Sequence, residues 1–328
     1  MARTIINNKQ VFQSYVLTTA KYDFSPYEKR IMYRLIVLAQ KEIEGIKLKD
    51  SLRKITPTNF GREITMPVSD ILKDEQDKNY AIAKAAFKSL SEKHIEYEDD
   101  EIWSYTPIIT APEIKKNSGF VKFYVFDNIW RCLLDFTKGF RKYELITAMK
   151  FKSVYAMRFY ELMSGQTKPL FVALEGSDGL RERFGLQGKY KLTADFRRKV
   201  LDVAKQELDE SSPYSFVAKE EKAGKKIIGW TLYPVFYEDR EDPALQEQAR
   251  MAKITARLQL ENNVYDYLRF SYNFDSKEIN RNKKTIIEGQ NRIPDFIGFL
   301  ADLKNGARMA ENSKGYVIGA IKKKLKEN

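Results

Sequence analysis

The segment that decides the fold runs from Asp178 to Phe236, DGLRERFGLQGKYKLTADFRRKVLDVAKQELDESSPYSFVAKEEKAGKKIIGWTLYPVF. Its start predicts a short helix that ends at Gly185, a residue type common just after a helix C-terminus. GLQGKYKL predicts a turn, and Thr193 is expected to cap a longer helix. The buried stripe of that helix is predicted to be Phe196, Val200, Val203, Ala204 and Leu208. Two strands around a turn at Ala223–Gly224 follow, and this order of elements indicates a winged-helix domain.

The same order of elements occurs earlier in the chain. Ser25, Pro26 and Glu28 form a capping-box pattern for a helix that extends to Gln40. Ser69 begins a short predicted helix, residues 77–79 form a turn, and residues 80–93 form a second helix. The apolar stripe of that helix is expected to be Ile82, Ala86, Phe87 and Leu90. Two strand-like segments, 94–109 and 118–127, are predicted to form the hairpin.

The second unit opens with residues 143–166, which have a helical pattern, with a break predicted near Phe151 and a new helix capped by Ser153. The chain therefore contains a structural repeat of about 110 residues without obvious sequence identity. We expect an α+β protein with two tandem winged-helix domains, at 1–135 and 136–240. From Pro243 onward the sequence predicts a helical extension, at 241–328, which ends in a basic amphipathic helix.

The composition points to a polyanionic partner. The net charge is +12 and the pI is about 9.3, and lysine or arginine docked on phosphates releases condensed counterions. An anionic membrane is disfavoured because no single helix combines a basic face with a bulky apolar one. The N-terminus lacks a signal-peptide pattern and no apolar run reaches membrane-spanning length, so we expect a cytoplasmic protein.

Histidine and cysteine are scarce, with only His94 and Cys132 present. An intrachain disulfide and a Cys/His zinc site are therefore excluded. His94 is expected to lie at a helix C-terminus, where it helps to satisfy the last carbonyl groups. The acidic run Glu96, Glu98, Asp99, Asp100 and Glu101 is interpreted as a solvated turn, although carboxylates also build two-metal sites. We predict no metal, no cofactor and no catalytic activity.

Double-stranded DNA is the expected partner, because the second helix of a helix-turn-helix lies in the major groove. In the second domain, Arg197 or Arg198 is expected to read a guanine through a bidentate contact. Lys189 and Lys191 lie in the turn, where phosphate contacts are natural. The full candidate set for this domain adds Arg181, Arg183, Thr193, the helix start at Lys150, Lys152, Ser153 and Arg158, and the hairpin tip at Lys222, Lys225 and Lys226. A solvated face is the competing interpretation for each residue.

In the first domain, the second helix contains no arginine, and we expect it to contribute affinity for the DNA backbone more than sequence reading. The candidates there are Asn79, Lys84, Lys88 and Ser91 on the helix, with Lys115 and Lys116 at the hairpin tip. Hairpin tips of this kind lie along a phosphate strand or in a minor groove.

Four segments resemble one family, the iteron-binding plasmid replication initiators. They are YDFSPYEKRIMYRLI (22–36), YELITAMKFKSVYAMRFYELM (143–163), LRERFGLQGKYKLTADFRRKVLDVAKQEL (180–208) and FVAKEEKAGKKIIGWTLYPV (216–235). They span about two thirds of the chain, and FKSVYAMRFYEL is the most specific. The extension after Pro243 lies outside the resemblance.

The resemblance implies a protein that binds direct repeats, called iterons, at a plasmid origin, with both winged helices on one face of the duplex. It further implies a homodimer, formed through the N-terminal domain, that represses its own gene and is in equilibrium with a monomer that opens the origin. Host initiator and replicative helicase are then recruited. A winged-helix transcriptional repressor remains the alternative, since a fold does not fix a function.

Two enzymatic alternatives are disfavoured by the sequence. Rolling-circle nickases resemble one another in a His-x-His metal-binding motif. A chain with one histidine cannot provide this motif. A nucleotide-driven helicase requires G-x-x-x-x-G-K-[ST], and GLQGK at 185–189 has the wrong spacing and no following Ser or Thr. A protein–protein adaptor is the third class, and it predicts negligible binding to duplex DNA.

Overall fold

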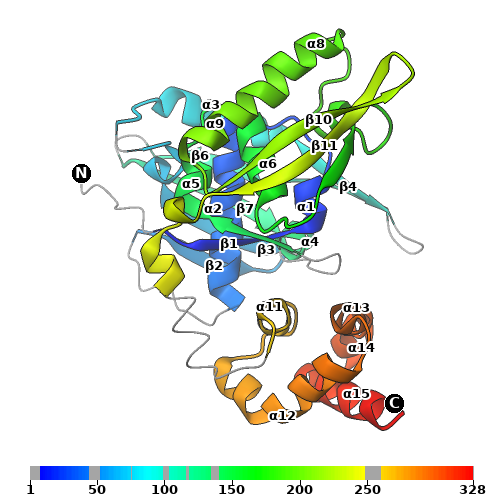
Figure 1. The fold of residues 1–328 in the computed structure, drawn as a ribbon. Helices are drawn as coiled ribbons and strands as arrows, with labels where there is room; N and C mark the ends of the chain where they lie inside the picture. Colours follow the sequence, from blue (N-terminus) through cyan, green and yellow to red (C-terminus); the bar gives the residue numbers. More distant parts are fainter. Residues whose placement is uncertain are drawn as a thin grey trace.

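The structure is a computed structural model that describes residues 8–43, 52–74, 76–98, 103–115, 118–133, 140–247 and 260–327. It contains two winged-helix domains followed by a helical C-terminal region, so the predicted fold class is confirmed (Figure 1). The precise domain boundaries at 135 and 240 stay predictions.

The first domain is built on α2 (Pro26–Ile43), and its predicted capping box is confirmed. The Glu28 N–H donates to Ser25 Oγ (3.3 Å), and the Ser25 N–H donates to Glu28 Oε2 (2.6 Å). The short 3₁₀ helix η1 (Val68–Ile71) and α3 (Tyr80–Glu92) complete the helix-turn-helix. The sheet beside them has the order β2-β3-β7-β6, with strands β2 (Lys54–Thr58), β3 (Gly61–Pro67), β6 (Thr110–Ile114) and β7 (Phe120–Phe126).

The hairpin of the first domain differs from the prediction. Residues 94–109 are not one strand: β4 (His94–Glu98) turns back and pairs with β5 (Trp103–Pro107) as a separate two-stranded arm. Ile108 and Ile109 are buried and interrupt the strand, and β6 then pairs with β7 as the wing. The helical stripe was also wrong at one position. Ile82 is exposed and Ala83 is buried, because the stripe follows positions 83, 86, 87 and 90 of α3.

The next elements along the chain are β8 (Phe140–Glu144), α5 (Leu145–Lys150) and α6 (Val154–Met163). The predicted helix break is confirmed: Ser153 Oγ accepts the N–H of Tyr155 (3.1 Å) at the start of α6. Tyr143, by contrast, lies on a strand, because β8 pairs with β1 (Gln10–Ser14) from the start of the chain.

The helix-turn-helix of the second domain consists of α7 (Leu180–Arg183) and a long second helix. The second helix contains α8 (Thr193–Phe196), a π-helical turn (Arg197–Leu201) and α9 (Asp202–Ser211). Thr193 is the first helical residue and not the cap, because the carbonyl of Leu192 already accepts the Phe196 N–H (3.0 Å). Val203 is exposed, contrary to prediction. The wing sheet has the order β10-β11-β9, from β9 (Leu170–Ala173), β10 (Tyr214–Ala223) and β11 (Lys226–Phe236), so the predicted turn is confirmed.

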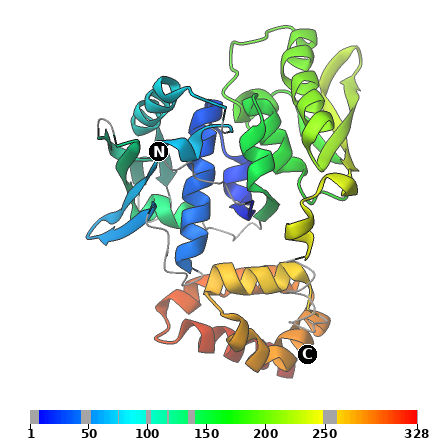
Figure 2. The ribbon, with the colours of Figure 1, turned by 90° about the vertical axis from the view of Figure 1, so that its left-hand side faces the viewer.

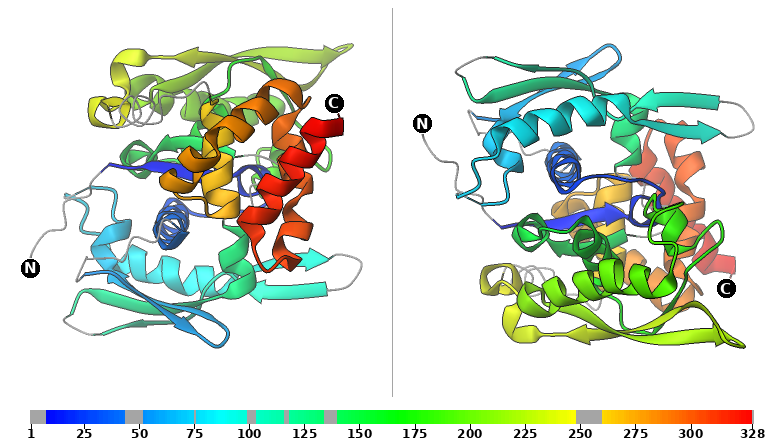
Figure 3. Two further views of the ribbon diagram at one scale, coloured as in Figure 1. Left: turned by 90° about the horizontal axis from the view of Figure 1, so that it is seen from below. Right: turned by 90° about the horizontal axis from the view of Figure 1, so that it is seen from above.

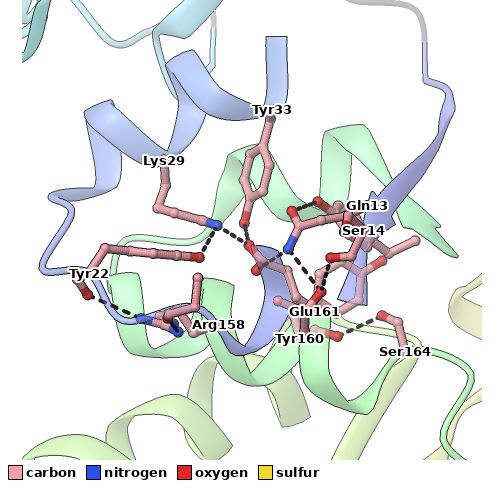
Figure 4. A network of polar contacts seen from close by, with 12 residues as sticks. Gln13, Ser14, Tyr22, Lys29, Tyr33, Arg158, Tyr160, Glu161 and Ser164 are labelled. Atoms are coloured by element: carbon pink, nitrogen blue, oxygen red, sulfur yellow. Dashed lines mark hydrogen bonds and ion pairs between the residues drawn. The ribbon is translucent and has the colours of Figure 1, made fainter. Parts of the chain in front are cut away.

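A buried polar network joins β1 and α2 to α6 (Figure 4). The carboxylate of Glu161 on α6 accepts from Tyr33 Oη (2.6 Å) and Gln13 Nε2 (2.7 Å), and it pairs with Lys29 Nζ (2.6 Å). Burial and the Glu161 charge hold the pKa of Tyr33 well above its usual value, so the phenol stays a donor. One apolar core runs continuously through both domains around this network. The two winged helices are thereby held as one body.

The C-terminal region is a separate helical unit with its own core. It contains α11 (Asn262–Tyr272), α12 (Ser276–Arg292), α13 (Phe296–Asp302), α14 (Lys304–Met309) and α15 (Ser313–Glu327). Phe12 of β1 packs against Phe270 with ring centroids 4.3 Å apart, which docks the unit on the winged-helix body. The final helix is amphipathic as predicted, with Val317 and Ile321 buried. Part of the helix predicted after Pro243 lies outside the described residues.

The helical unit lies on the side of the molecule opposite the second helices of the two helix-turn-helix motifs, α3 and α8–α9. We call these two helices the recognition helices. Figure 2 places it beneath both winged-helix domains. In Figure 3, α3 and α8–α9 face the viewer from above, whereas α12 and α15 face the viewer from below. The remaining elements are α1 (Tyr15–Thr19), α4 (Asp127–Cys132) and the 3₁₀ turn η3 (Glu238–Arg240).

Candidate nucleic-acid interface

The turn of the second helix-turn-helix is organised by a buried arginine. Arg181 donates to the carbonyl oxygens of Lys189 (2.5 Å) and Tyr190 (2.7 Å), and its Nε donates to the Glu175 carboxylate (2.8 Å). Its guanidinium also lies over the Phe196 ring, 5.0 Å from the centroid. Arg181 is therefore a scaffold residue, and its prediction as a DNA contact is corrected. It fixes the backbone from which the exposed side chains of Lys189 and Lys191 project.

The two arginines at the start of the long helix have different surroundings. Arg197 Nη1 pairs with Glu220 on β10 (2.7 Å), which links the helix to the wing. Arg198 is 71% exposed and pairs with Asp195 one turn earlier (2.7 Å). An exposed pair of this type is worth about 0–1 kcal/mol, so Arg198 is readily available to an incoming ligand. Lys199, beside them, is exposed with its Nζ 5.2 Å from the Tyr190 ring centroid.

The tip of the second wing is cationic. Lys222, Lys225 and Lys226 are exposed around the turn at Gly224. Lys222 Nζ lies 3.1 Å from the Glu220 carboxylate. Hydrogen bonds from Lys222 and Arg197 lower the pKa of Glu220, so this carboxyl stays ionised as a counterion within the interface.

The first domain presents a basic groove between α3 and its wing. The side chains of Lys84 and Lys88 on α3 and of Lys115 on the wing are exposed. Together with Tyr80 and Phe87, they line a cavity of about 620 Å³. Asn79, at the N-cap of α3, is exposed and donates to Asp77 (2.8 Å), and Ser91 Oγ donates to the Lys88 carbonyl (2.7 Å). Lys116 lies outside the described residues.

One of the residues predicted near the start of α6, Arg158, is a scaffold residue. Arg158 is 3% exposed, and its guanidinium donates to the carbonyls of Ala20 (2.7 Å), Tyr22 (3.1 Å) and Arg183 (2.5 Å). Its prediction as a DNA contact is corrected, because its Nη donors are used across the domain junction. Arg183 is half-buried at the same junction.

The backbone at the start of α6 already carries a carboxylate. Glu207 of α9 accepts the N–H groups of Lys152 (2.7 Å) and Ser153 (2.9 Å). The predicted phosphate site on these amides is therefore corrected, because a phosphate would have to displace Glu207. The side chains of Lys150 and Lys152 are exposed nearby and stay candidates for backbone contacts.

The surviving candidates come from both domains, and α3 and α8–α9, which carry several of them, lie on one side of the molecule (Figure 3). The sequence pattern indicates the exposed cations but not the roles of two carboxylates. Glu207 accepts the N–H groups of residues 152 and 153, and Glu220 pairs with Arg197, and these partners are distant in the chain. The arrangement can bind phosphates with lysines and offer Arg198 to a base edge, and it provides no nucleophile with a base beside it. Within the described residues, no group of three His, Cys, Asp or Glu side chains could hold a metal.

Two family models match the chain in order. The model described as "Initiator Replication protein, WH1" matches residues 10–164, and the one described as "Initiator Rep protein, WH2" matches residues 177–233. The chain belongs to the initiator replication protein family. The WH1 match extends through β8, α5 and α6. The WH2 match includes α7, the long helix α8–α9 and most of the β10–β11 wing.

One solved structure that matches is described as "Crystal structure of Pi initiator protein in complex with iteron DNA". It is 18% identical, and the match covers 70% of this chain and 98% of that chain with a TM-score of 0.49. The family assignment rests on the two family models and not on this match, because likeness at that level is too weak to add to it.

His94 and the acidic run that follows it were also assigned roles from the sequence. His94 Nδ1 lies 3.1 Å from the carbonyl of Glu92, the last residue of α3, so its contact with a helix-end carbonyl is confirmed. The residue itself begins β4, and its ring stacks on Tyr105. The acidic run at 99–101 lies outside the described residues. In the part of the chain that the structure describes, no helix has the length and apolar character needed to cross a bilayer.

Proposed function

We propose that this protein initiates the replication of a plasmid by binding direct repeats at the origin with both winged helices. The observation that carries the proposal is the match of WH1 and WH2 initiator models in order along one chain. The geometry supports it, because both recognition helices and both wings carry exposed cations on one side of the body. The shared core and the hydrogen bond from Arg158 to the carbonyl of Arg183 support a fixed spacing of the two modules.

Within this proposal, the second domain reads sequence. The start of α8 enters a major groove, where Arg198 reaches a guanine and Lys189 and Lys191 contact flanking phosphates. Arg197 holds the wing through Glu220 and reaches DNA only after that pair opens. Thr193, Lys150, Lys152 and the wing lysines at 222, 225 and 226 contribute backbone contacts. Arg183 is half-buried and is left out of the contact set.

The first domain contributes affinity more than specificity. Its cations are lysines, which meet phosphates as point charges without the planar fork that an arginine offers to guanine. Lys84 and Lys88 on α3 and Lys115 on the wing border one groove, in which a phosphate strand fits beside Asn79 and Ser91.

The proposal extends to partners and location. The protein is a non-catalytic, cofactor-free initiator of the cytoplasm that interconverts between a homodimer, which represses its own gene, and a monomer, which acts at the origin. Host initiator and replicative helicase join the monomer there. The position of the C-terminal unit supports this arrangement, since it lies away from the recognition helices and stays accessible when they hold DNA (Figure 3).

Footprinting of the purified protein on the DNA beside its gene tests the proposal. Protection that recurs over several direct repeats, each about two helical turns long and next to an AT-rich tract, is the expected result. The affinity should fall steeply with salt concentration, because phosphate contacts release counterions. A single protected inverted repeat would identify an operator and a transcriptional repressor instead. No protection at low salt would contradict both DNA-binding functions.

A further inference from the structure

A cavity lies where the C-terminal unit meets the first winged-helix domain. It has a volume of about 390 Å³, within the range of sites that hold small ligands. We call it the junction pocket. The winged-helix side contributes Glu42, Arg62, Trp130 and Arg131, and the C-terminal unit contributes residues 270–273, Lys304, Ala307, Arg308 and Ser313.

The junction pocket is lined by four cations and one carboxylate, and that carboxylate is already engaged. Glu42 Oε1 accepts from Arg62 Nε (2.9 Å), and Glu42 Oε2 accepts from Trp130 Nε1 (2.6 Å). Arg62 also pairs with Asp127 (2.7 Å). Glu42 therefore does not neutralise the exposed Arg131 and Arg308, which reach the pocket from separate units of the protein. Bringing like charges together is unfavourable unless an anion lies between them.

The polar groups of the pocket suit the same kind of ligand. Ser271 Oγ is buried and has no hydrogen-bond partner among the described residues, and buried hydroxyls normally have one. Asn273, at the left-handed C-cap of α11, is exposed beside it. Ser313 is the first residue of α15, and the amino end of a helix carries partial positive charge. Polar groups of α11 and α15 thus line one cationic cavity.

We propose that the junction pocket binds a phosphate group and that the bound phosphate fastens the C-terminal unit to the first winged-helix domain. Arg131 and Arg308 approach the phosphate from opposite walls, and Ser271 donates its hydroxyl to it. The phosphate belongs either to a free nucleotide or to a nucleic-acid strand. The C-terminal unit, which forms one wall of the pocket, lies on the side of the molecule opposite α3 and α8–α9 (Figure 3), so the pocket is filled independently of the duplex that these helices bind.

Calorimetric titration of the full chain with inorganic pyrophosphate tests the pocket. In the variant R131Q/R308Q, the affinity should fall at least tenfold relative to the unchanged protein. The matched control is K277Q/K323Q, which removes two exposed cations of the C-terminal unit outside the pocket and should change the affinity less than twofold. Equal affinity in the two double variants, or no binding by the unchanged protein, would overturn the proposal.

Two further arms make the result specific. Ser271→Ala removes the buried hydroxyl without altering charge and should weaken pyrophosphate binding about tenfold to a hundredfold, the fold-change expected for one hydrogen bond to a charged group. An unchanged affinity in Ser271→Ala together with R131Q/R308Q would again contradict the site. Tighter binding of a nucleoside triphosphate than of pyrophosphate would identify the ligand as a nucleotide, and tighter binding of a six-nucleotide single strand would identify it as nucleic acid.

Discussion

At the residue scale, the structure separates arginines that build the protein from those that meet a ligand. Arg158 and Arg181 are nearly buried, and their guanidinium groups donate to backbone carbonyls. Arg197 and Arg198 are exposed and paired only with surface acids. The role of each of these four arginines is decided by its contacts in the folded protein. Each arginine is therefore expected to respond differently to substitution.

Arg198→Ala should relax specificity at one base pair of the repeat. Loss of a bidentate contact costs about 1–3 kcal/mol against the preferred base and little against the other three. The measurement is the affinity for repeats with single base-pair changes. Lys191→Ala is the matched control, because loss of a phosphate contact should weaken all sequences alike. An Arg198→Ala variant with an unchanged base preference at every position would rule out its reading role.

Arg158→Leu should destabilise the fold without removing a DNA contact. The substitution leaves three carbonyls without their donor and removes contacts with the rings of Tyr22 and Phe184. The expected loss is about 2–4 kcal/mol of unfolding free energy, measured by urea denaturation. Arg158→Lys keeps the charge but replaces the planar guanidinium, whose two Nη atoms reach separate carbonyls, by a single nitrogen, and it should lose a similar amount. If either variant kept full stability and lost DNA affinity, the scaffold role would be wrong.

Asp266 should make stability dependent on pH. Burial raises the pKa of this carboxyl to about 6 in the folded protein, and Lys142 and Arg269 offset part of that rise. Between about pH 4 and pH 6, Asp266 is ionised in the unfolded chain but still protonated in the folded protein. The free energy of unfolding therefore falls as the pH rises through this window.

Asp266→Asn should therefore be more stable than the unchanged protein at pH 7, by about 1–2 kcal/mol after allowance for partial exposure, and equally stable near pH 4. Urea denaturation of both proteins across this range gives the comparison. A variant that is less stable at pH 7 would mean that the charged carboxylate is favoured in the folded state.

At the element scale, the turn after α7 depends on Gly185. This residue has a φ of +61°, and a Cβ added to it would lie 2.6 Å from Cβ of Asp23 in the first domain. Gly185→Ala combines backbone strain with a clash at the domain junction, and we expect a loss of about 2–4 kcal/mol of unfolding free energy.

Gly224→Ala is the control for that substitution. Gly224 has a nearly identical φ of +62° at the wing tip, where an added Cβ would meet nothing within 4 Å. Backbone strain alone should cost about 1 kcal/mol there. Thermal unfolding of the two variants measures the difference, and equal losses would show that the contact with Asp23 gives no added constraint.

Local signals predicted the elements well. The capping box at Ser25, the cap at Ser153 and the glycine after α7 are each decided by a few neighbouring residues. The prediction of one strand over 94–109 was wrong because its residues are typical of strands throughout. Only the pairing of β6 with the distant β7, and of β4 with β5, separates the wing from the β4–β5 arm.

The candidate site was predicted in outline but not in detail. The cationic residues of the second helix and the wing are visible in sequence, since exposed charges follow the surface of a predicted helix or hairpin. The burial of Arg158 depends on Ala20, Tyr22 and Arg183, which come from two other segments of the chain. The carboxylate of Glu207 at the start of α6 is a tertiary contact of the same kind, with no local sign.

At the scale of the whole molecule, the protein has two faces. One presents the recognition helices and wings of both domains, and the other holds the C-terminal helices (Figure 3). The continuous core and the hydrogen bond from Arg158 to the Arg183 carbonyl hold the two winged helices in register. A rigid pair of modules suits a site of fixed length, such as one repeat of about two helical turns.

The most direct test is the salt dependence of binding to a single repeat after Lys189, Lys191, Arg197 and Arg198 are all changed to glutamine. The account predicts an affinity at least a hundredfold lower and a salt slope that is smaller by about 0.9 for each phosphate contact removed. The control is glutamine substitution of four exposed cations on the C-terminal unit, Lys277, Arg281, Lys323 and Lys326. It should change the affinity and the salt slope less than twofold. An affinity and a slope unchanged by the first set of substitutions would contradict the account.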